Sequence, residues 1–572
     1  MVKKEGEKAE LSDYIYAYSL ANAIEFGKAK ENKILPKLFR HGLKKDEIPK
    51  IMPLIKEIVN KVNSWDEKTR KLQFGRYEHL IPEKQEQEAG LLELSGINED
   101  GKVNLTGGKP VFRIAPFPSG ALHLGNAKTF LLNSLYAERY GGKLILVIDD
   151  TIGSEKKPIE KEAYELIKKG LKYLGIEYDK KIIYKSDRLK IYYKYAEELI
   201  EKEMAYVCYC TQKEFQKLKE QGKECGCRQL PKEIQKKRWK EMFTIEEGHA
   251  VLRIKTGMQN PNPAFRDRVL FKISDREHPK VKKKYRIWPT LEMSWAVDDH
   301  LLGITHIIRG NDLMIETDME RAIWKIFSWK DREIIHTGLV NIDFGEKSEN
   351  KISKSKSREE VLSGKYSGWD DPRTWSIQSL ERRGISPEAI REFVREIGLN
   401  KQDITIPIET LYAINRRMID SEANRYYFID APKEIVVAGI PKELKEVEIP
   451  IHPEKVFMRK IKSGRTILVS NNDFEKLKGK EVRLLHLANI YLNLDTSVSS
   501  LENKNIPKIQ WVSGKDKIKA RILMEDGEWI EGFADSGIKK LKVGEVIQFE
   551  RFGFVRYDGS KQGIKEFWFA HK

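Results

Sequence analysis

The segment RIAPFPSGALHLGNAK, residues 113–128, combines side chains and turn residues that suit a phosphate group. It lies between a short apolar stretch and a helical one, which predicts a strand-to-helix turn at the carboxyl edge of a parallel sheet. A helix N-terminus there presents free N–H groups and a partial positive charge to an anion. His123 and Asn126 lie three residues apart, so both can face the same anion. Taken alone, the segment is also compatible with an ordinary loop whose histidine lies at the surface.

A second segment, NKISKSKS at residues 350–357, places three lysines among small hydroxyl residues. In a polar loop these ammonium groups can fold over a triphosphate, because lysine binds phosphate as a point charge. The alternative is a solvated basic loop, and the segment by itself favours that alternative.

The four cysteines form two close pairs, Cys208 with Cys210 and Cys225 with Cys227. Four thiols in two pairs can satisfy the tetrahedral coordination of Zn²⁺. The single residue between the cysteines of each pair is a less common spacer than two, so four reduced structural cysteines remain the alternative. So few cysteines in 572 residues exclude a disulfide scaffold and indicate a reducing compartment, which favours the cytoplasm.

The charge balance points to a polyanionic partner. The formal net charge is +17, and residues 211–290 contribute much of it, with 21 Lys and Arg against 10 Asp and Glu. A basic protein without such a partner is the alternative. Apolar runs fall far short of the roughly 20 residues of a membrane-spanning helix, and the basic N-terminus is followed by no apolar segment, so we expect neither a membrane span nor a secretory signal.

The elements that must position these residues alternate between strand and helix from about residue 109, as in a doubly wound parallel sheet. Short alternating strands replace this pattern near the C-terminus, which is typical of β-barrels. The sequence therefore predicts a multidomain α/β protein with a Rossmann-like core split by an insertion. The expected parts are a helical region (1–105), the first half of the core (106–204), a basic insertion with the cysteines (205–285), the second half of the core (286–358), a helical linking region (359–432) and β-barrels (433–572).

In this order and around an insertion, the two phosphate-binding segments resemble the HIGH and KMSKS signatures of the class I aminoacyl-tRNA synthetases. They stand here as HLGN at 123–126 and KISKS at 351–355. The segment from Arg113 to His123 further resembles the R-x-A-P-x-P-x-G-x-L-H opening of the glutamyl/glutaminyl subgroup. IDDT and VDDHLLGITHIIRG, which begin at Ile148 and Val297, are similar to later signatures of that subgroup, and the β-rich end is similar to its archaeal and eukaryotic type.

This resemblance implies an ATP site, with Mg²⁺ expected alongside the nucleotide. His123 and Asn126 would stabilise charge on the α-phosphate, Lys354 would hold the leaving pyrophosphate, and Lys351 would assist. The resemblance also implies a structural Zn²⁺ at the four cysteines. The implied ATP contacts are Pro116, Phe117, Pro118, Ser119, Gly120, Ala121, Leu122, His123, Leu124, Gly125, Asn126 and Lys354.

For the amino acid, the resemblance implies that Arg113 and Arg309 meet carboxylates and that Asp149 holds the ammonium group. A guanidinium at position 309 suits a carboxylate and accepts nothing from an amide, which favours glutamate over glutamine. Structural roles are the alternative, with Arg309 paired to the nearby Asp312. Leu291 and Trp295 are also expected in this pocket, at positions where the family usually has tyrosine and a small residue.

The implied activity is that of a glutamate–tRNA ligase, which charges tRNA(Glu) with glutamate. The sequence does not decide whether tRNA(Gln) is a further substrate. Arg309 argues against a glutaminyl-tRNA synthetase. The two intact signatures argue against a non-catalytic tRNA-binding paralogue, and the long C-terminal region argues against a tRNA-modifying paralogue. Four tail aromatics could stack on unpaired bases, but a place in the barrel core is favoured for them: Trp511, Trp529, Tyr557 and Trp568. The sequence does not predict the oligomeric state, and a monomer is compatible with it.

Overall fold

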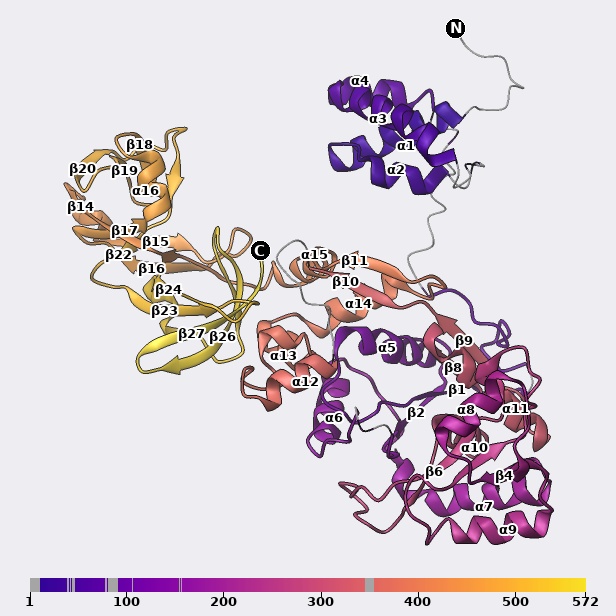
Figure 1. Cartoon of the computed structure of the whole chain (residues 1–572). Helices are drawn as coiled ribbons and strands as arrows, with labels where there is room; N and C mark the ends of the chain where they lie inside the picture. Colours follow the sequence, from indigo (N-terminus) through magenta and orange to yellow (C-terminus); the bar gives the residue numbers. More distant parts are fainter. Residues whose placement is uncertain are drawn as a thin grey trace. The chain divides into compact units, whose positions relative to one another are not determined.

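The computed structural model describes residues 11–38, 41, 43, 47–77, 80, 91–104, 106–153, 155, 157–344 and 354–572 of the chain. These form two compact units, residues 1–90 and residues 91–572 (Figure 1). Leu94 is buried in the core of the larger unit, so this unit begins before residue 105, where the sequence places the end of the helical region.

The smaller unit consists of helices packed around one apolar core. Four of them are α1 (Leu11–Phe26), α2 (Glu31–Leu38), α3 (Ile48–Ser64) and α4 (Glu67–Phe74). The apolar faces of α1 and α3 meet in this core, with Ile15 and Ile55 fully buried. α1 and α3 thus give this unit the helical character expected of the N-terminal region.

The larger unit is built on a five-stranded parallel sheet in the order β3-β2-β1-β8-β9. The order reverses between β1 and β8, where ligands bind in doubly wound sheets. Helix α5 follows β1 and helix α6 follows β2, as the alternation of the sequence predicts. The bounds are β1 (Val111–Ile114), α5 (Leu124–Arg139), β2 (Lys143–Ile148), α6 (Ala163–Tyr173), β3 (Ile183–Tyr184), β8 (His306–Gly310) and β9 (Glu333–Thr337).

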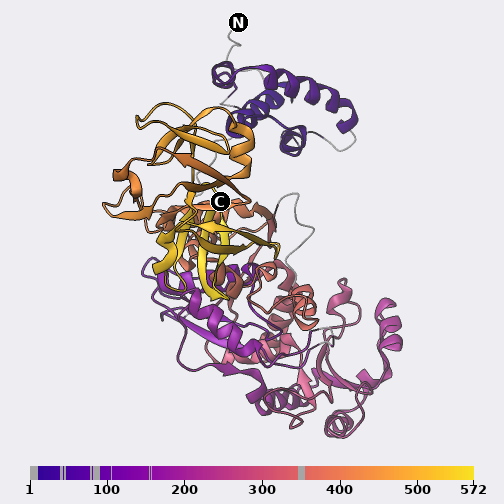
Figure 2. The same ribbon diagram turned by 90° about the vertical axis from the view of Figure 1, so that its left-hand side faces the viewer.

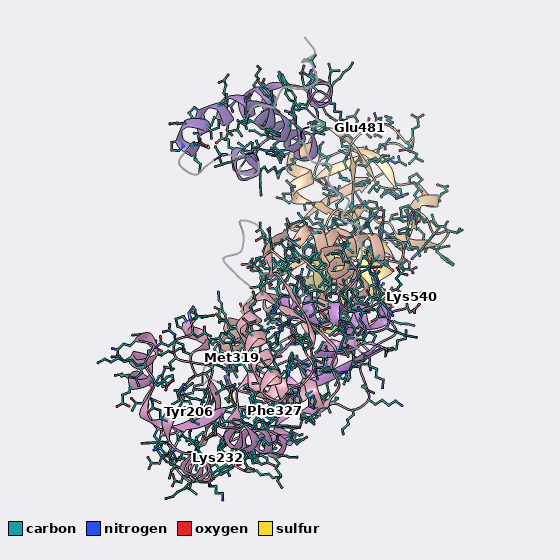
Figure 3. All side chains as sticks on the ribbon, turned by 90° about the vertical axis from the view of Figure 1, so that its right-hand side faces the viewer. Tyr206, Lys232, Met319, Phe327, Glu481 and Lys540 are labelled. Carbon is teal, nitrogen blue, oxygen red and sulfur yellow. The ribbon has the colours of Figure 1, made fainter. Side chains whose placement is uncertain are left out.

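Between β3 and β8 the chain forms a separate antiparallel sheet in the order β4-β5-β6-β7. Its apolar face packs with α7, α10 and α11 into a second core, in which Trp288 and Trp324 are buried. Figure 3 labels Tyr206 and Lys232 in this region and Met319 on α11. The bounds are α7 (Leu189–Glu201), β4 (Ala205–Cys208), α8 (Gln212–Glu220), α9 (Lys232–Glu241), β5 (Val251–Ile254), β6 (Val269–Ile273), β7 (Ile287–Pro289), α10 (Leu291–Leu301) and α11 (Met314–Ile326).

A mainly helical region links the core to the C-terminal sheets. It contains α12 (Lys354–Leu362), α13 (Ile377–Arg383), α14 (Pro387–Ile397) and α15 (Ile408–Ile419), and a parallel pair of strands, β10 (Val340–Asp343) and β11 (Ile404–Pro407). Arg383 is fully buried and donates to the carbonyl oxygens of Phe569 and Ala570. This guanidinium therefore ties the helical region to the last strand of the chain.

The C-terminal region contains two seven-stranded sheets and a separate antiparallel pair formed by β15 and β16 (Figure 2). In each seven-stranded sheet the two edge strands are close neighbours in the sequence: only Tyr427 separates β12 from β13, and two residues separate β21 from β22. This brings the edges of each sheet together into a nearly closed barrel, as predicted. The bounds are β12 (Arg425–Tyr426), β13 (Phe428–Asp430), β14 (Pro432–Ala438), β15 (Glu446–Pro450), β16 (Met458–Lys462), β17 (Thr466–Ser470), α16 (Asn471–Leu477), β18 (Glu481–Leu484), β19 (Ala488–Tyr491), β20 (Asp495–Ser500), β21 (Lys508–Ile509), β22 (Val512–Ser513), β23 (Ile518–Leu523), β24 (Trp529–Ala534), β25 (Val546–Phe549), β26 (Gly553–Lys561) and β27 (Ile564–His571).

The aromatic residues of this region mostly fill the barrels. Trp511, Tyr557 and Trp568 are buried, whereas Trp529 is exposed to 39%. The core position favoured for these aromatics therefore holds for three of the four. Within the part of the chain that the structure describes, no helix combines the length and apolarity needed to cross a membrane.

Candidate active site

One large pocket, with a volume of about 1280 Å³, opens at the point where the strand order reverses. Both halves of the core and the inserted sheet contribute to its wall. A volume of this order accommodates a nucleotide together with a small second ligand. The predicted site residues that line it are Arg113, Pro116, Phe117, Ser119, Leu122, His123, Gly125, Asn126, Asp149, Leu291, Trp295 and Arg309.

The turn from β1 to α5 has the strand–turn–helix geometry expected of a phosphate site. His123 is the N-cap residue of α5, and its carbonyl oxygen accepts the N–H of Asn126 at 2.9 Å. The carbonyl of Pro116 accepts the N–H of Asp149 at 3.1 Å, and that of Leu122 accepts the N–H of Ile377 at 2.8 Å. The turn is thus held against the end of β2 and against the helical region, and the N-terminus of α5 faces the pocket.

Gly120 occupies a position in this turn that only glycine can fill. Its φ of +143° belongs to a region that other residues rarely adopt, and a Cβ there would lie 2.3 Å from ring atoms of Trp369. Pro118, Gly120, Ala121 and Leu124 shape the turn without being part of the pocket wall.

The lysine-rich segment lies largely outside the described residues, and Lys351 is among those not described. Lys354 is the first residue of α12, and only its backbone is described. Arg358, one helical turn later, lines the pocket and forms an ion pair with Glu160. The first turn of α12 therefore lies beside the pocket.

The two arginines predicted to meet substrate carboxylates are buried and already paired. Arg113 donates to both carboxylate oxygens of Asp299, at 2.5 and 3.0 Å. Arg309 donates to Glu320 at 2.7 Å and to the hydroxyl of Thr317. Within the protein, the carboxylate that pairs with Arg309 is thus that of Glu320, eleven positions further along the chain, and not that of the nearby Asp312.

Asp149, predicted to hold the substrate ammonium, also has an internal partner. The Nζ of Lys185 donates to Asp149 Oδ2 at 3.0 Å and to Ser294 Oγ at 2.8 Å, and Lys185 is fully buried. Burial lowers the pKa of Lys185, while the neighbouring carboxylates of Asp149 and Asp298 oppose that shift. The sequence does not single out this lysine; its only signal is its place directly after β3, which pairs with β2, the strand that precedes Asp149.

The indole ring of Trp295 lies against three of these charged side chains. Its ring centroid lies 4.9 Å from the Cζ of Arg113, 5.0 Å from the Nζ of Lys185 and 5.4 Å from the Cζ of Arg309. A cation over the face of an indole is stabilised by the ring quadrupole, more strongly when water is excluded. The bulky indole thus acts as a common support for the cations at the base of the pocket.

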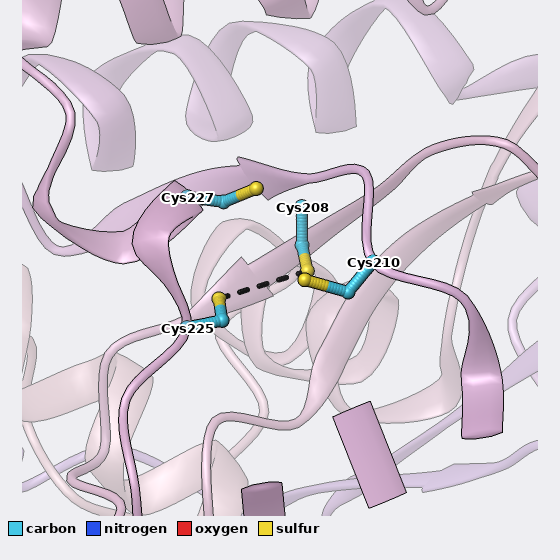
Figure 4. A group of neighbouring side chains, drawn as sticks. All are labelled: Cys208, Cys210, Cys225 and Cys227. Carbon is cyan, nitrogen blue, oxygen red and sulfur yellow. Dashed lines mark hydrogen bonds between the residues drawn. The ribbon is translucent and has the colours of Figure 1, made fainter. Parts of the chain in front are cut away.

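The four cysteine thiols form a separate cluster in the insertion (Figure 4). Cys208 ends β4, Cys210 follows it, and Cys225 and Cys227 lie at the short helical turn before α9. All four Sγ atoms lie within 4.8 Å of one another, and the Cys208 and Cys225 sulfurs are 3.9 Å apart. Tetrahedral Zn²⁺ with bonds of about 2.3 Å needs sulfurs about 3.8 Å apart, so this donor set can hold the ion.

Comparison with known proteins identifies the family of the chain. Residues 110–421 match the family model "tRNA synthetases class I (E and Q), catalytic domain". Residues 423–513 and 508–558 match two anti-codon binding domains of the same group. These matches define the class of the protein as the class I aminoacyl-tRNA synthetases of the glutamate and glutamine group.

The relatives narrow this class further. The chain is 36% identical to the glutamate–tRNA ligase of Methanothermobacter thermautotrophicus, over 98% of this chain and 100% of that protein. It is 37% identical to the enzyme of the same name from Archaeoglobus fulgidus, over 97% and 99%, and 39% identical to that of Thermococcus onnurineus, over 98% and 100%. The chain belongs to the glutamate–tRNA ligase family.

Proposed function

We propose that the chain joins glutamate and ATP to form glutamyl-adenylate and pyrophosphate, and then transfers the glutamyl group to the 3′ end of tRNA(Glu), releasing AMP. The observation that carries this proposal is that a phosphate-binding turn and two buried guanidinium groups line one pocket. Such a pocket suits a nucleoside triphosphate beside an amino acid with two carboxylates.

The phosphate side would act by electrostatic stabilisation. His123, Asn126 and the N-terminus of α5 would contact the α-phosphate as negative charge builds on it, which needs positioned donors and no covalent intermediate with the enzyme. Lys354 would hold the leaving pyrophosphate and Lys351 would assist; the position of Arg358 on the pocket wall supports this placement. Mg²⁺ would accompany ATP and neutralise phosphate charge.

The amino-acid side would distinguish glutamate by charge. Arg309 would bind the side-chain carboxylate and Arg113 the second carboxylate. The Asp149 carboxylate would accept hydrogen bonds from the substrate ammonium group while it also accepts from Lys185. Leu291 and Trp295 would form the walls. The glutaminyl alternative is disfavoured because a guanidinium offers an amide N–H₂ group no acceptor.

Transfer RNA would contact three regions of the chain. Four basic residues of the insertion line the pocket, which supports entry of the acceptor end from that side: Lys219, Arg253, Arg266 and Arg268. The rest of the basic insertion would meet backbone phosphates, and the barrels would bind the anticodon. A ligase of this kind works in translation, so a cytoplasmic location is expected.

The four cysteines would bind one structural Zn²⁺. Their contribution would be to hold the loop after β4 against the turn before α9, because the ion joins two chain segments seventeen positions apart. Its role would be in the shape of the insertion and not in the activation of glutamate.

The direct test is aminoacylation of purified tRNA(Glu) and tRNA(Gln) with glutamate and with glutamine. Charging of tRNA(Glu) with glutamate alone is expected, and charging of tRNA(Gln) with glutamate would extend the substrate range. Charging with glutamine would support the glutaminyl alternative. The absence of glutamate-dependent ATP–pyrophosphate exchange, with and without tRNA, would support a non-catalytic tRNA-binding protein.

A further inference from the structure

The Arg309–Glu320 pair places a carboxylate of the protein on the guanidinium that the proposed function assigns to the substrate. Glu320 lies on α11 and is fully buried, and its Oε1 accepts from Arg309 Nη1 at 2.7 Å. Among the described residues, Glu320 Oε2 and Arg309 Nε have no hydrogen-bond partner. The guanidinium thus keeps an unused N–H, while its single positive charge is already balanced by Glu320.

Counted together with the charged groups around it, ionised Glu320 completes a cluster that is close to electrically neutral. The charged groups that act on it are Arg309 from β8, Arg113 from β1 and Asp299 from α10. The imidazole of His336 on β9 contacts Thr317, and burial lowers the pKa of His336, which favours its neutral form. Adding the carboxylate of a substrate side chain therefore leaves an excess of negative charge in a dry site, which is unfavourable unless a proton is taken up.

We propose that Glu320 is a positioning residue that sets how much of the Arg309 charge is available to the substrate, and thereby tunes the discrimination of glutamate from glutamine. This inference rests on the proposed function of the pocket. Ionised, Glu320 competes with the side-chain carboxylate of glutamate. Protonated, it still orients Arg309 by a hydrogen bond and leaves the full guanidinium charge to the substrate.

The ionisation of Glu320 changes near neutral pH. Burial raises the pKa of Glu320 to about 7, against the opposing effect of Arg309 and with the support of Asp299. The competing charge is therefore present above pH 7 and lost as the pH falls through 7. The substrate carboxylate stays ionised throughout, so a lower pH favours glutamate binding.

The test compares the wild-type enzyme with Glu320→Gln, which keeps the shape and the hydrogen bond but carries no charge. In the wild type, the KM for glutamate should rise about tenfold between pH 6 and pH 8, because only about a tenth of Glu320 is protonated at the higher pH. In Glu320→Gln the KM should stay at its low value at both pH values, with kcat and the KM for ATP changed less than about twofold. Glutamine should remain a poor substrate for both enzymes.

The matched control is Asp318→Asn, an exposed carboxylate on the same helix, which should behave as the wild type. A second measurement does not depend on the folding of any variant: titration calorimetry of glutamate with the wild-type enzyme and tRNA at pH 8, in buffers of different ionisation enthalpy, should reveal the uptake of close to one proton.

The outcomes separate the inference from the proposed function. A wild-type enzyme without glutamate-dependent pyrophosphate exchange would overturn the proposed function. An active wild-type enzyme with no proton uptake, or with the same pH dependence of KM as Glu320→Gln, would overturn only the role of Glu320.

Discussion

At the residue scale, the base of the pocket consists of oppositely charged pairs that the chain supplies itself. Arg113 pairs with Asp299, Lys185 with Asp149 and Arg309 with Glu320. A charge that is removed from water without a partner is very costly, so a pocket that is ready for a charged substrate has to hold its own counter-charges. Substrate recognition in such a site is an exchange or sharing of partners.

The Lys185–Asp149 pair leads to a prediction about stability. Lys185→Met should lower the free energy of unfolding by about 3 kcal/mol, because it leaves a buried carboxylate without its cation. The double variant Lys185→Met/Asp149→Asn should recover much of that loss, since it removes both charges. Chemical denaturation at pH 7 measures both changes. A double variant as unstable as the single one would show that the two charges are not coupled.

At the element scale, the β1–α5 turn is held by contacts from distant parts of the chain. Trp369 packs against Gly120, and the backbone N–H groups of Asp149 and Ile377 bond to the turn. The proposed phosphate site therefore depends on the helical linking region as well as on the sheet.

Gly120→Ala tests this dependence. The new methyl group must displace Trp369 or change the backbone of the turn, and the positive φ adds strain. We expect a KM for ATP at least about tenfold higher, with folding retained. The matched control is Gly75→Ala, a glycine whose Cβ would meet no atom closer than 3.8 Å. Kinetics of pyrophosphate exchange provide the measurement, and an unchanged KM for ATP would contradict the role given to the turn.

The cysteine cluster provides a second prediction at this scale. Metal analysis of the purified protein should find close to one Zn²⁺ per chain, and Cys225→Ser/Cys227→Ser should contain none. Because the ion would shape the insertion, the variant should show a higher KM for tRNA and little change in the KM for glutamate. A metal-free wild-type protein of full activity would establish four structural thiols instead.

At the scale of the whole molecule, charge is concentrated where RNA is expected. The net charge of +17 has its densest part at residues 211–290, and basic side chains of the insertion reach the pocket wall. Contacts with phosphates release counterions, which makes binding sensitive to salt. The buried pairs of the amino-acid site are shielded from that effect.

Added salt should therefore weaken the binding of tRNA much more than the binding of glutamate. Raising KCl from 50 to 200 mM should weaken tRNA binding by about 100-fold or more, whereas the KM for glutamate should change less than about twofold. Fluorescence titration with tRNA(Glu) and steady-state kinetics measure the two effects. Equal sensitivity would mean that glutamate binds at an exposed site.

The sequence by itself determined the local features: the helices and strands with clear periodicity, the turn before α5, the cysteine spacing and the likeness to a synthetase family. These follow from residues that are close along the chain, where periodicity and turn chemistry act. Only the tertiary structure decided the partners of the buried charges. Asp299 lies 186 positions from Arg113, and Lys185 lies 36 positions from Asp149. The need to neutralise a buried charge is general, but which residue meets it depends on how the sheet and its covering helices pack.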